Sequence, residues 1–172
     1  MLSFYLAGCK VERTPEQARR EQIPFQVLTP DEVLTVDVLG EILLPGSAAA
    51  GLAHFIDHQL NAGIAEQLLM IKYLGVNPPF SPFYSNGLAA VNTAAISHYG
   101  EVLAELDEEQ GAALVRKMAE GKLKDWSGPP APLFYFVLRS DAVDVFYGTK
   151  EGVERLGIPY MAHIEPPSRW GE

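Results

Sequence analysis

The chain has 172 residues, of which 48% are hydrophobic and 20% charged, so it is long and apolar enough to fold around a buried core as one domain. Its 22 Asp and Glu residues outnumber its 13 Lys and Arg residues, and the net charge of −9 argues against binding to the phosphate backbone of nucleic acid. A single cysteine excludes metal sites built from several cysteines, and without the glycine-rich motifs that bind dinucleotides and triphosphates the sequence carries little equipment for redox or phosphoryl chemistry.

Residues 1–9 end in Leu6-Ala7-Gly8-Cys9, which matches a bacterial lipobox. In a lipoprotein this cysteine is diacylated and becomes the mature N-terminus. Two or three acyl chains hold a protein firmly at a membrane, because each buried CH₂ contributes about 0.8 kcal/mol. The apolar run before Cys9 is short and no basic residue precedes it, so we interpret residues 1–9 as the remnant of a signal peptide that begins further upstream. The alternative is a buried or incidental cysteine.

Residues 10–27 are polar and contain Pro15 and Pro24, which predicts an extended tether between Cys9 and a helical domain at residues 28–172. Helix signals begin at Thr29, an N-cap followed by proline and acidic residues. Asp107 opens a later helix in the same way, with Gln110 at the capping-box position. The apolar positions predict helices or helical segments at residues 30–44, 47–61, 64–73, 83–99, 108–120, 133–147 and 150–156.

The apolar run at residues 133–138 is hydrophobic on all sides, which predicts a central buried helix. A strand is the alternative, but Val143 and Phe146 continue the run at helical spacing. On the helix at 83–99, the expected core stripe consists of Leu88, Val91, Ala95 and Ile96. No stretch alternates cleanly with the period of a strand, so the sequence predicts an all-α domain of about six or seven helices, with long loops rich in Pro and Gly.

His54 and His58 lie four residues apart, so both imidazoles can share one helix face and bind a metal ion if a third ligand comes from elsewhere. The alternative is a partly exposed polar face of the helix. Asp37 and Glu41 also lie one turn apart and could do acid–base chemistry. On an acidic protein such a pair is more typical of a solvated surface. No catalytic residue is assigned.

Large aromatic residues near prolines and loop ends are typical of surfaces that pack against another protein. On this basis Trp126, Tyr147, Tyr160 and Trp170 are the candidate interface residues. The alternative is that these side chains close the core of their own domain. The C-terminal stretch at residues 158–167 is too apolar for a free tail, so we expect it to wrap its own domain or to lie on a partner.

Several short motifs resemble, in order and spacing, those of the gluconate 2-dehydrogenase subunit 3 family. They are Leu28-Thr29-Pro30-Asp31-Glu32, Leu39-Gly40-Glu41-Ile42-Leu43-Leu44-Pro45, Phe55-Ile56-Asp57, Leu88-Ala89-Ala90-Val91-Asn92, Tyr99-Gly100, the run at 134–139 and Phe146-Tyr147-Gly148. The resemblance covers residues 28–170. The sequence departs from the family at residues 145–152, where many relatives have Asp-Pro-x-Tyr-Gly-Gly-Asn, and it lacks a twin-arginine signal.

This resemblance implies a small, non-catalytic subunit of a periplasmic dehydrogenase for sugars or alcohols, associated with the bacterial inner membrane. In such complexes the large subunit is an FAD-dependent protein of the glucose–methanol–choline type, and a third subunit is often a cytochrome c. FAD and haem c are then expected in the partners, and no cofactor in this chain. Family members typically carry the export signal and help the catalytic subunit to mature and leave the cytoplasm.

The sequence therefore predicts an accessory subunit, anchored through Cys9, that stabilises a flavin-dependent dehydrogenase. Two alternatives stay open at this point. One is a free-standing periplasmic helical binding protein or export chaperone, which would release its client. The other is a metal-dependent enzyme that uses His54 and His58.

Overall fold

Capping side chains set where two of the main helices begin. In α2 (Pro30–Leu43), Thr29 accepts a hydrogen bond from the backbone N–H of Glu32, and the Glu32 carboxylate accepts one from the Thr29 N–H. Asp107 and Gln110 form the same reciprocal pair at the start of α5 (Glu108–Ala119). These capping boxes satisfy backbone groups that a helix start leaves unpaired. The box at Asp107 and the N-cap at Thr29 were predicted from the sequence, whereas the pairing of Thr29 with Glu32 was not.

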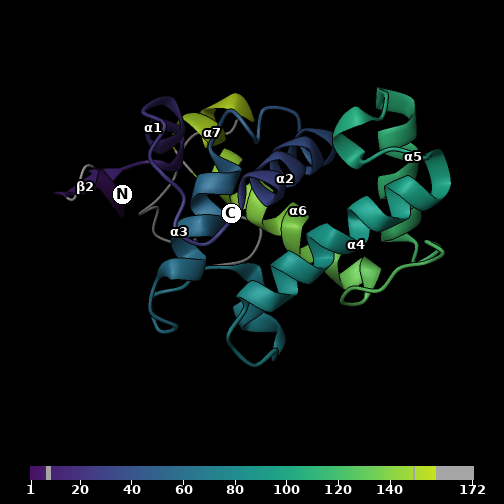
Figure 1. The fold of residues 1–172 in the computed structure, drawn as a ribbon. Coiled ribbons are helices and arrows are strands. Elements are labelled where there is room, and N and C mark those ends of the chain that lie inside the picture. Colours follow the sequence, from purple (N-terminus) through teal and green to yellow (C-terminus); the bar gives the residue numbers. More distant parts are fainter. Residues whose placement is uncertain (7–8, 149, 158–172) are drawn as a thin grey trace, which may run out of the picture.

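The computed structural model describes residues 1–6, 9–148 and 150–157, and these are mainly helical (Figure 1). The all-α class and the single domain are thereby confirmed. A two-stranded hairpin and two short 3₁₀ helices complete the fold. In chain order the elements are β1 (Leu2–Leu6), β2 (Cys9–Arg13), α1 (Pro15–Arg20), α2, α3 (Leu52–Asn61), η1 (Met70–Leu74), α4 (Ser81–Tyr99), η2 (Leu103–Glu105), α5, α6 (Ala131–Tyr147) and α7 (Lys150–Arg155).

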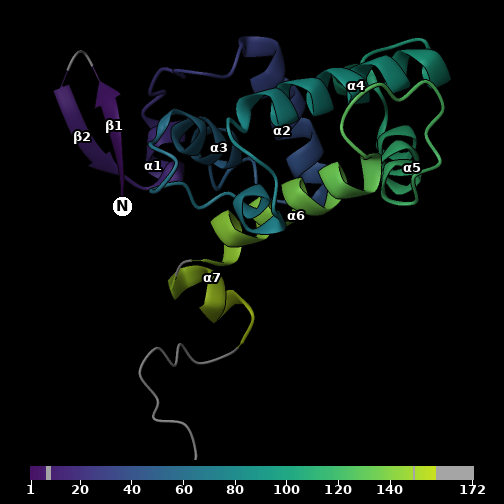
Figure 2. The same ribbon diagram turned by 90° about the horizontal axis from the view of Figure 1, so that it is seen from below.

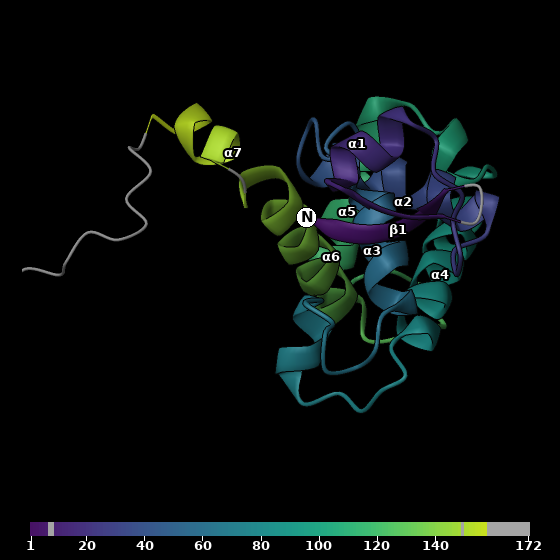
Figure 3. The same cartoon turned by 90° about the vertical axis from the view of Figure 1, so that its left-hand side faces the viewer.

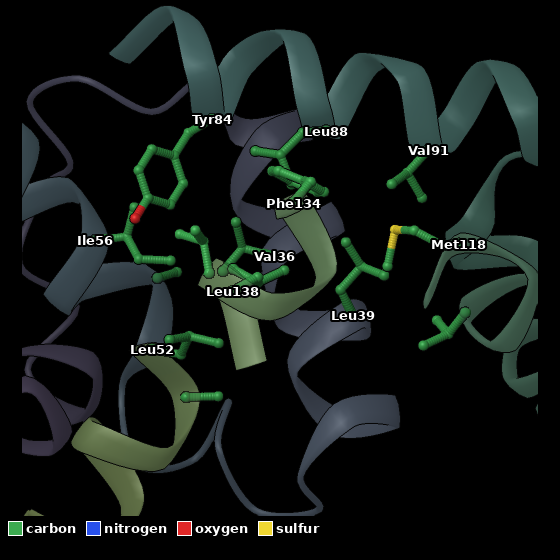
Figure 4. Close-up of a cluster of buried hydrophobic side chains, with 14 of the residues drawn as sticks. Val36, Leu39, Leu52, Ile56, Tyr84, Leu88, Val91, Met118, Phe134 and Leu138 are labelled. Atoms are coloured by element: carbon green, nitrogen blue, oxygen red, sulfur yellow. The ribbon is translucent and has the colours of Figure 1, made fainter. Parts of the chain in front are cut away.

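Helix α6 is the central element and packs against α2, α3, α4 and α5 (Figure 1). Phe134, Val137 and Leu138 on α6 are fully buried, which confirms the prediction of a central buried helix. Figure 4 shows side chains from these five helices converging on one core. The labelled ones are Val36, Leu39, Leu52, Ile56, Tyr84, Leu88, Val91, Met118, Phe134 and Leu138.

The expected extended tether at residues 10–27 is corrected by the structure. Strand β2 pairs antiparallel with β1, and α1 packs on α3 (Figures 1 and 2). Phe4, Ala18 and Ile23 are buried in a second small core. The missed local signal is a third capping box, in which Thr14 pairs with Gln17 and Pro15 occupies the first turn.

Two other predicted segments are shorter than expected. Residues 45–51 form turns and α3 begins only at Leu52, after Gly51 with a φ of 90°. A Cβ at Gly51 would lie 2.3 Å from the backbone carbonyl of Pro15, so the close approach of α1 requires glycine here. At residues 64–73, only η1 is helical in the structure, because the side chains of Gln59 and Gln67 bond to the backbone of Leu68 and Ala62 in place of helical hydrogen bonds.

One residue of the predicted core stripe on α4 is wrongly placed. Leu88, Val91 and Ala95 are buried, but Ile96 is 51% exposed. Helical spacing alone places position 96 with the stripe, whereas the buried face of α4 is set by the elements that pack on it, chiefly α2, together with η2, α5 and α6. Ile96 therefore lies on the surface near the end of α4.

The crossing of α4 and α6 requires a glycine at position 87. A Cβ at Gly87 would lie 2.2 Å from Cε2 of Phe134, which is fully buried. We therefore expect Gly87→Ala to destabilise the domain by about 1–2 kcal/mol, because overpacking outweighs the gain of about 1 kcal/mol in helix propensity. Denaturant unfolding measures the loss. Gly63→Ala is the control, since a Cβ there meets no atom within 4 Å and the change should stay within about 0.5 kcal/mol. Equal effects of the two substitutions would contradict this packing.

Candidate functional site

Asp57 is a buried carboxylate that binds the chain entering α2. Its Oδ1 accepts hydrogen bonds from the backbone N–H groups of Val27 and Leu28, both at 2.8 Å, and its Oδ2 accepts one from Gln26 at 2.9 Å. The residue is only 4% exposed. All of these donors belong to the segment between α1 and α2, so Asp57 fixes this segment on α3 and is occupied with a structural task.

A second buried acid joins α6, α4 and η1. Asp141 is fully buried, and its carboxylate accepts hydrogen bonds from the hydroxyl of Tyr84 at 2.6 Å and from the backbone N–H of Met70 at 3.0 Å. Burial is the main cause that raises the pKa of Asp141 to about 7. The hydrogen bonds from Met70 and Tyr84 lower this pKa, and the charge of Asp144 raises it. Burial and the charge of Asp141 raise the pKa of Tyr84 as well. Both side chains lie inside the core, where they tie three elements together.

His54 is not on a partly exposed polar face, as the simpler sequence interpretation expected, because it is 5% exposed. Its Nε2 lies 3.1 Å from the carbonyl oxygen of Ile23, so Nε2 is the donor, and its ring packs on Phe25 with centroids 4.3 Å apart. Nδ1 is buried without a hydrogen-bond partner in the described part of the chain. Burial is the largest cause that lowers the pKa of His54.

His58 is half-buried and does not share the environment of His54. Its ring packs on Phe4 with centroids 5.0 Å apart, and burial lowers its pKa. Among the described residues, no three His, Cys, Asp or Glu side chains gather in a way that could hold a metal ion. The two histidines thus serve in the packing of the N-terminal segment on α3.

Of the four candidate interface aromatics, Trp126 and Tyr147 lie in the described part of the chain. Trp126 is half-buried, donates from Nε1 to the carbonyl of Pro129 at 2.5 Å and packs near Phe134. Tyr147 is half-buried at the end of α6, with its ring edge-on to Phe146. Trp126 therefore braces its own loop as well as lying near the surface. Tyr160 and Trp170 lie outside the described residues, as does the apolar stretch at 158–167.

The loop that links α3 to α4 presents an apolar surface that sequence reasoning missed. Figure 3 shows this segment projecting below α3 and α4. The Lys72 ammonium donates to the carbonyls of Ala65 and Gln67, and thereby braces the loop from within. Four large apolar side chains are nevertheless exposed by 39–64%, namely Ile64, Leu68, Tyr73 and Leu74. Apolar side chains grouped on a braced loop are typical of a protein-binding surface.

An open groove lies between α1, α2, η2 and α5 and has a volume of about 640 Å³. Apolar side chains from α2 and η2 line it, together with the acidic residues Asp37, Glu41, Asp107 and Glu108. Asp37 and Glu41 were expected to be simply solvated. Instead, Asp37 pairs with Arg19 at 2.6 Å, and Glu41 accepts hydrogen bonds from the backbone N–H groups of Gly46 and Ala48.

Cys9 is exposed and lies in β2, paired with Leu6 across the hairpin. Within the described ranges, no helix combines the length and the apolarity that crossing a bilayer requires. The hairpin therefore offers an accessible thiol at one end of the domain, next to the second small core.

The chain matches the model of one known protein family over most of its length. The family model described as gluconate 2-dehydrogenase subunit 3 matches residues 30–163, which includes α2 to α7. No curated protein and no solved structure matches the chain. The motifs that carry the resemblance occupy defined places in the fold, since Thr29 and Glu32 cap α2 and Asp57 is the buried carboxylate of α3.

Proposed function

The chain belongs to the gluconate 2-dehydrogenase subunit 3 family, and from this membership we propose that it is the non-catalytic small subunit of a membrane-associated, FAD-dependent dehydrogenase for sugars or alcohols. Its partners would be a flavoprotein of the glucose–methanol–choline type and a cytochrome c subunit, in the periplasm. The observation that carries the proposal is the family match over residues 30–163. The role would be to stabilise the catalytic subunit and to help its export.

The placement of the polar residues supports an accessory role. Asp57, Asp141 and His54 are each bonded to backbone or core groups of this domain. The groove between α1, α2, η2 and α5 is lined with carboxylates, which repel the anionic diphosphate of a flavin dinucleotide, so FAD fits the partner better than this chain. The exposed apolar loop at residues 62–75 supplies a surface for a stable subunit contact.

Deletion of the gene for this chain tests the proposal. We expect the catalytic flavoprotein to disappear from the periplasm, or to fall at least about tenfold there, while its transcript stays unchanged. Complementation with the wild-type chain should restore it. If the flavoprotein reached the periplasm in full amount and activity without this chain, the proposal would be wrong. If this chain were only an export chaperone, complementation would also restore the flavoprotein to the periplasm, but the chain itself would be absent from the purified mature complex.

The proposed anchor is Cys9, acylated after removal of the residues before it. Cys9→Ala should then move the chain from the membrane fraction to the soluble periplasmic fraction, because no acyl chain could be attached. Cleavage before Cys9 would also remove β1 and with it Phe4, so the second small core would keep Ala18 and Ile23 with the half-buried Val11 beside them. Mass spectrometry of the purified chain distinguishes a chain that is cleaved before Cys9 and acylated from one that keeps β1. A mature chain that still begins before Cys9 would contradict the anchor.

A further inference from the structure

We propose that the groove between α2 and α5 receives a segment of the catalytic partner that combines an apolar side chain with an Arg or Lys. This inference rests on the proposed function and adds the place and chemistry of one contact. This α2/α5 groove is the open groove of about 640 Å³ that contains Leu34, Asp37, Glu41, Leu106, Glu108 and Ala112.

The shape of the α2/α5 groove suits an inserted side chain. Its floor is apolar and includes Val38 and Ile42 from α2. At Gly111 the two helices approach so closely that an added Cβ would lie 3.0 Å from Cδ1 of Ile42, which closes the floor. Beside it, Ala112 is exposed and too small to fill the opening. On the rim, Leu34 is 52% exposed, so a large apolar side chain already faces solvent here.

The charges of the α2/α5 groove select the partner's chemistry. Four carboxylates line it against the single guanidinium of Arg19. Arg19 reaches Oδ2 of Asp37 at 2.6 Å, but Oδ1 of Asp37 is buried and has no hydrogen-bond donor in the described part of the chain. Buried carboxylate oxygens are normally satisfied by donors. Oδ1 of Asp37 is itself closed to the groove, so a cationic side chain from a partner would act on the exposed carboxylates Glu41, Asp107 and Glu108 and balance the excess of negative charge.

These features favour a protein segment over other ligands. The carboxylates repel phosphate groups, which argues against nucleic acid and anionic lipid headgroups. A purely cationic small molecule would leave the apolar rim at Leu34 uncovered. A segment with one apolar and one basic side chain satisfies both properties of the groove, and apolar and Arg residues are common anchors at the centres of protein interfaces.

The test uses the purified complex of this chain with its flavoprotein and two matched pairs of exposed substitutions. Leu34→Glu lies in the groove, whereas Ile96→Glu changes a residue of α4 outside it with nearly the same exposure, 52% against 51%. We expect Leu34→Glu to weaken the association at least about tenfold, and Ile96→Glu less than about twofold. Glu108→Lys and Glu101→Lys form the second pair, because both residues are exposed and only Glu108 lines the groove. Only Glu108→Lys should slow association and reduce its dependence on salt.

Hydrogen exchange provides a measurement that needs no variant. Formation of the complex should slow the exchange of backbone amides at residues 34–42 and 108–112 relative to the free chain. If the wild-type chain forms the complex but the exchange of these amides is unchanged and Leu34→Glu binds like Ile96→Glu, the groove is not the contact and the proposed function stands. If the wild-type chain does not bind the flavoprotein at all, the proposed function fails and this inference fails with it.

Discussion

Replacement of Asp57 by alanine is expected to lower the free energy of unfolding by about 3 kcal/mol or more. The substitution would leave the backbone N–H groups of Gln26, Val27 and Leu28 without their acceptor. Leu28 is buried, so water cannot replace the carboxylate there without opening the structure. An unsatisfied buried donor costs about 1–3 kcal/mol, and here several are created together.

Two further substitutions isolate the role of the Asp57 carboxylate. Asp57→Asn keeps an oxygen for Val27 and Leu28 but places an amide against the N–H of Gln26, so we expect a smaller loss, about 1–2 kcal/mol. Asp31→Ala removes an exposed carboxylate in the first turn of α2 and should change stability by no more than about 1 kcal/mol. Urea unfolding at neutral pH gives all three values. A loss for Asp57→Ala no larger than that for Asp31→Ala would contradict the proposed clamp.

The second large effect concerns Asp141. Asp141→Ala should cost about 2–4 kcal/mol, because the N–H of Met70 and the hydroxyl of Tyr84 both lose their buried acceptor. Asp141→Asn retains an oxygen for Met70, and its amide can donate to Tyr84. We therefore expect the Asn variant to be close to the wild type in stability at acidic pH, where the wild-type carboxyl is itself protonated.

The free energy of unfolding should depend on pH differently in the wild type and in Asp141→Asn, and the direction of the difference follows from the pKa of Asp141. The pKa of Asp141 is about 7 in the folded chain, against 3.8 as the ordinary value, so between these pH values the folded state holds a proton that the unfolded state has lost. Stability from this group is therefore present at low pH and is lost as the pH rises toward 7. Asp141→Asn removes this titration.

Thermal or urea unfolding at pH 5 and pH 8 measures that difference. Relative to the wild type, Asp141→Asn should gain about 2–3 kcal/mol between these two pH values, since one pKa unit corresponds to about 1.4 kcal/mol. His54 and His58, whose pKa values are lowered, act in the opposite direction below pH 6.5, but they are present in both proteins and cancel in the comparison. Parallel pH profiles would contradict a raised pKa at Asp141.

Local rules account for the parts of the fold that were predicted correctly. The starts of α2 and α5 depend on Thr29 with Glu32 and Asp107 with Gln110, pairs only three residues apart. Helix α6 follows from a long apolar run. The same rule applied to Thr14 and Gln17 would have found α1, but the prolines nearby favoured a tether. Strand β1 could not be found in this way, because its packing depends on α3, about fifty residues later.

The buried acids left a weaker signal in the sequence. Asp141 is surrounded at helical spacing by Val137, Leu138 and Val145, so it interrupts the apolar face of a buried helix. An acid in that position points to a buried hydrogen-bond network, although the partners Tyr84 and Met70 cannot be inferred from spacing. The α2/α5 groove leaves no local signal at all, because its walls come from stretches far apart in the chain, namely Arg19, residues 34–48 and residues 103–112.

We propose, above all, that this chain works in a stable complex with a flavoprotein. The most direct test is to purify the tagged full-length chain from solubilised membranes, and to determine the mass and the visible absorbance of the product by size-exclusion chromatography with light scattering. We predict one peak that contains this chain and a larger subunit in a fixed ratio, with the absorption bands of oxidised flavin. A colourless peak with the mass of the chain alone would contradict the claim.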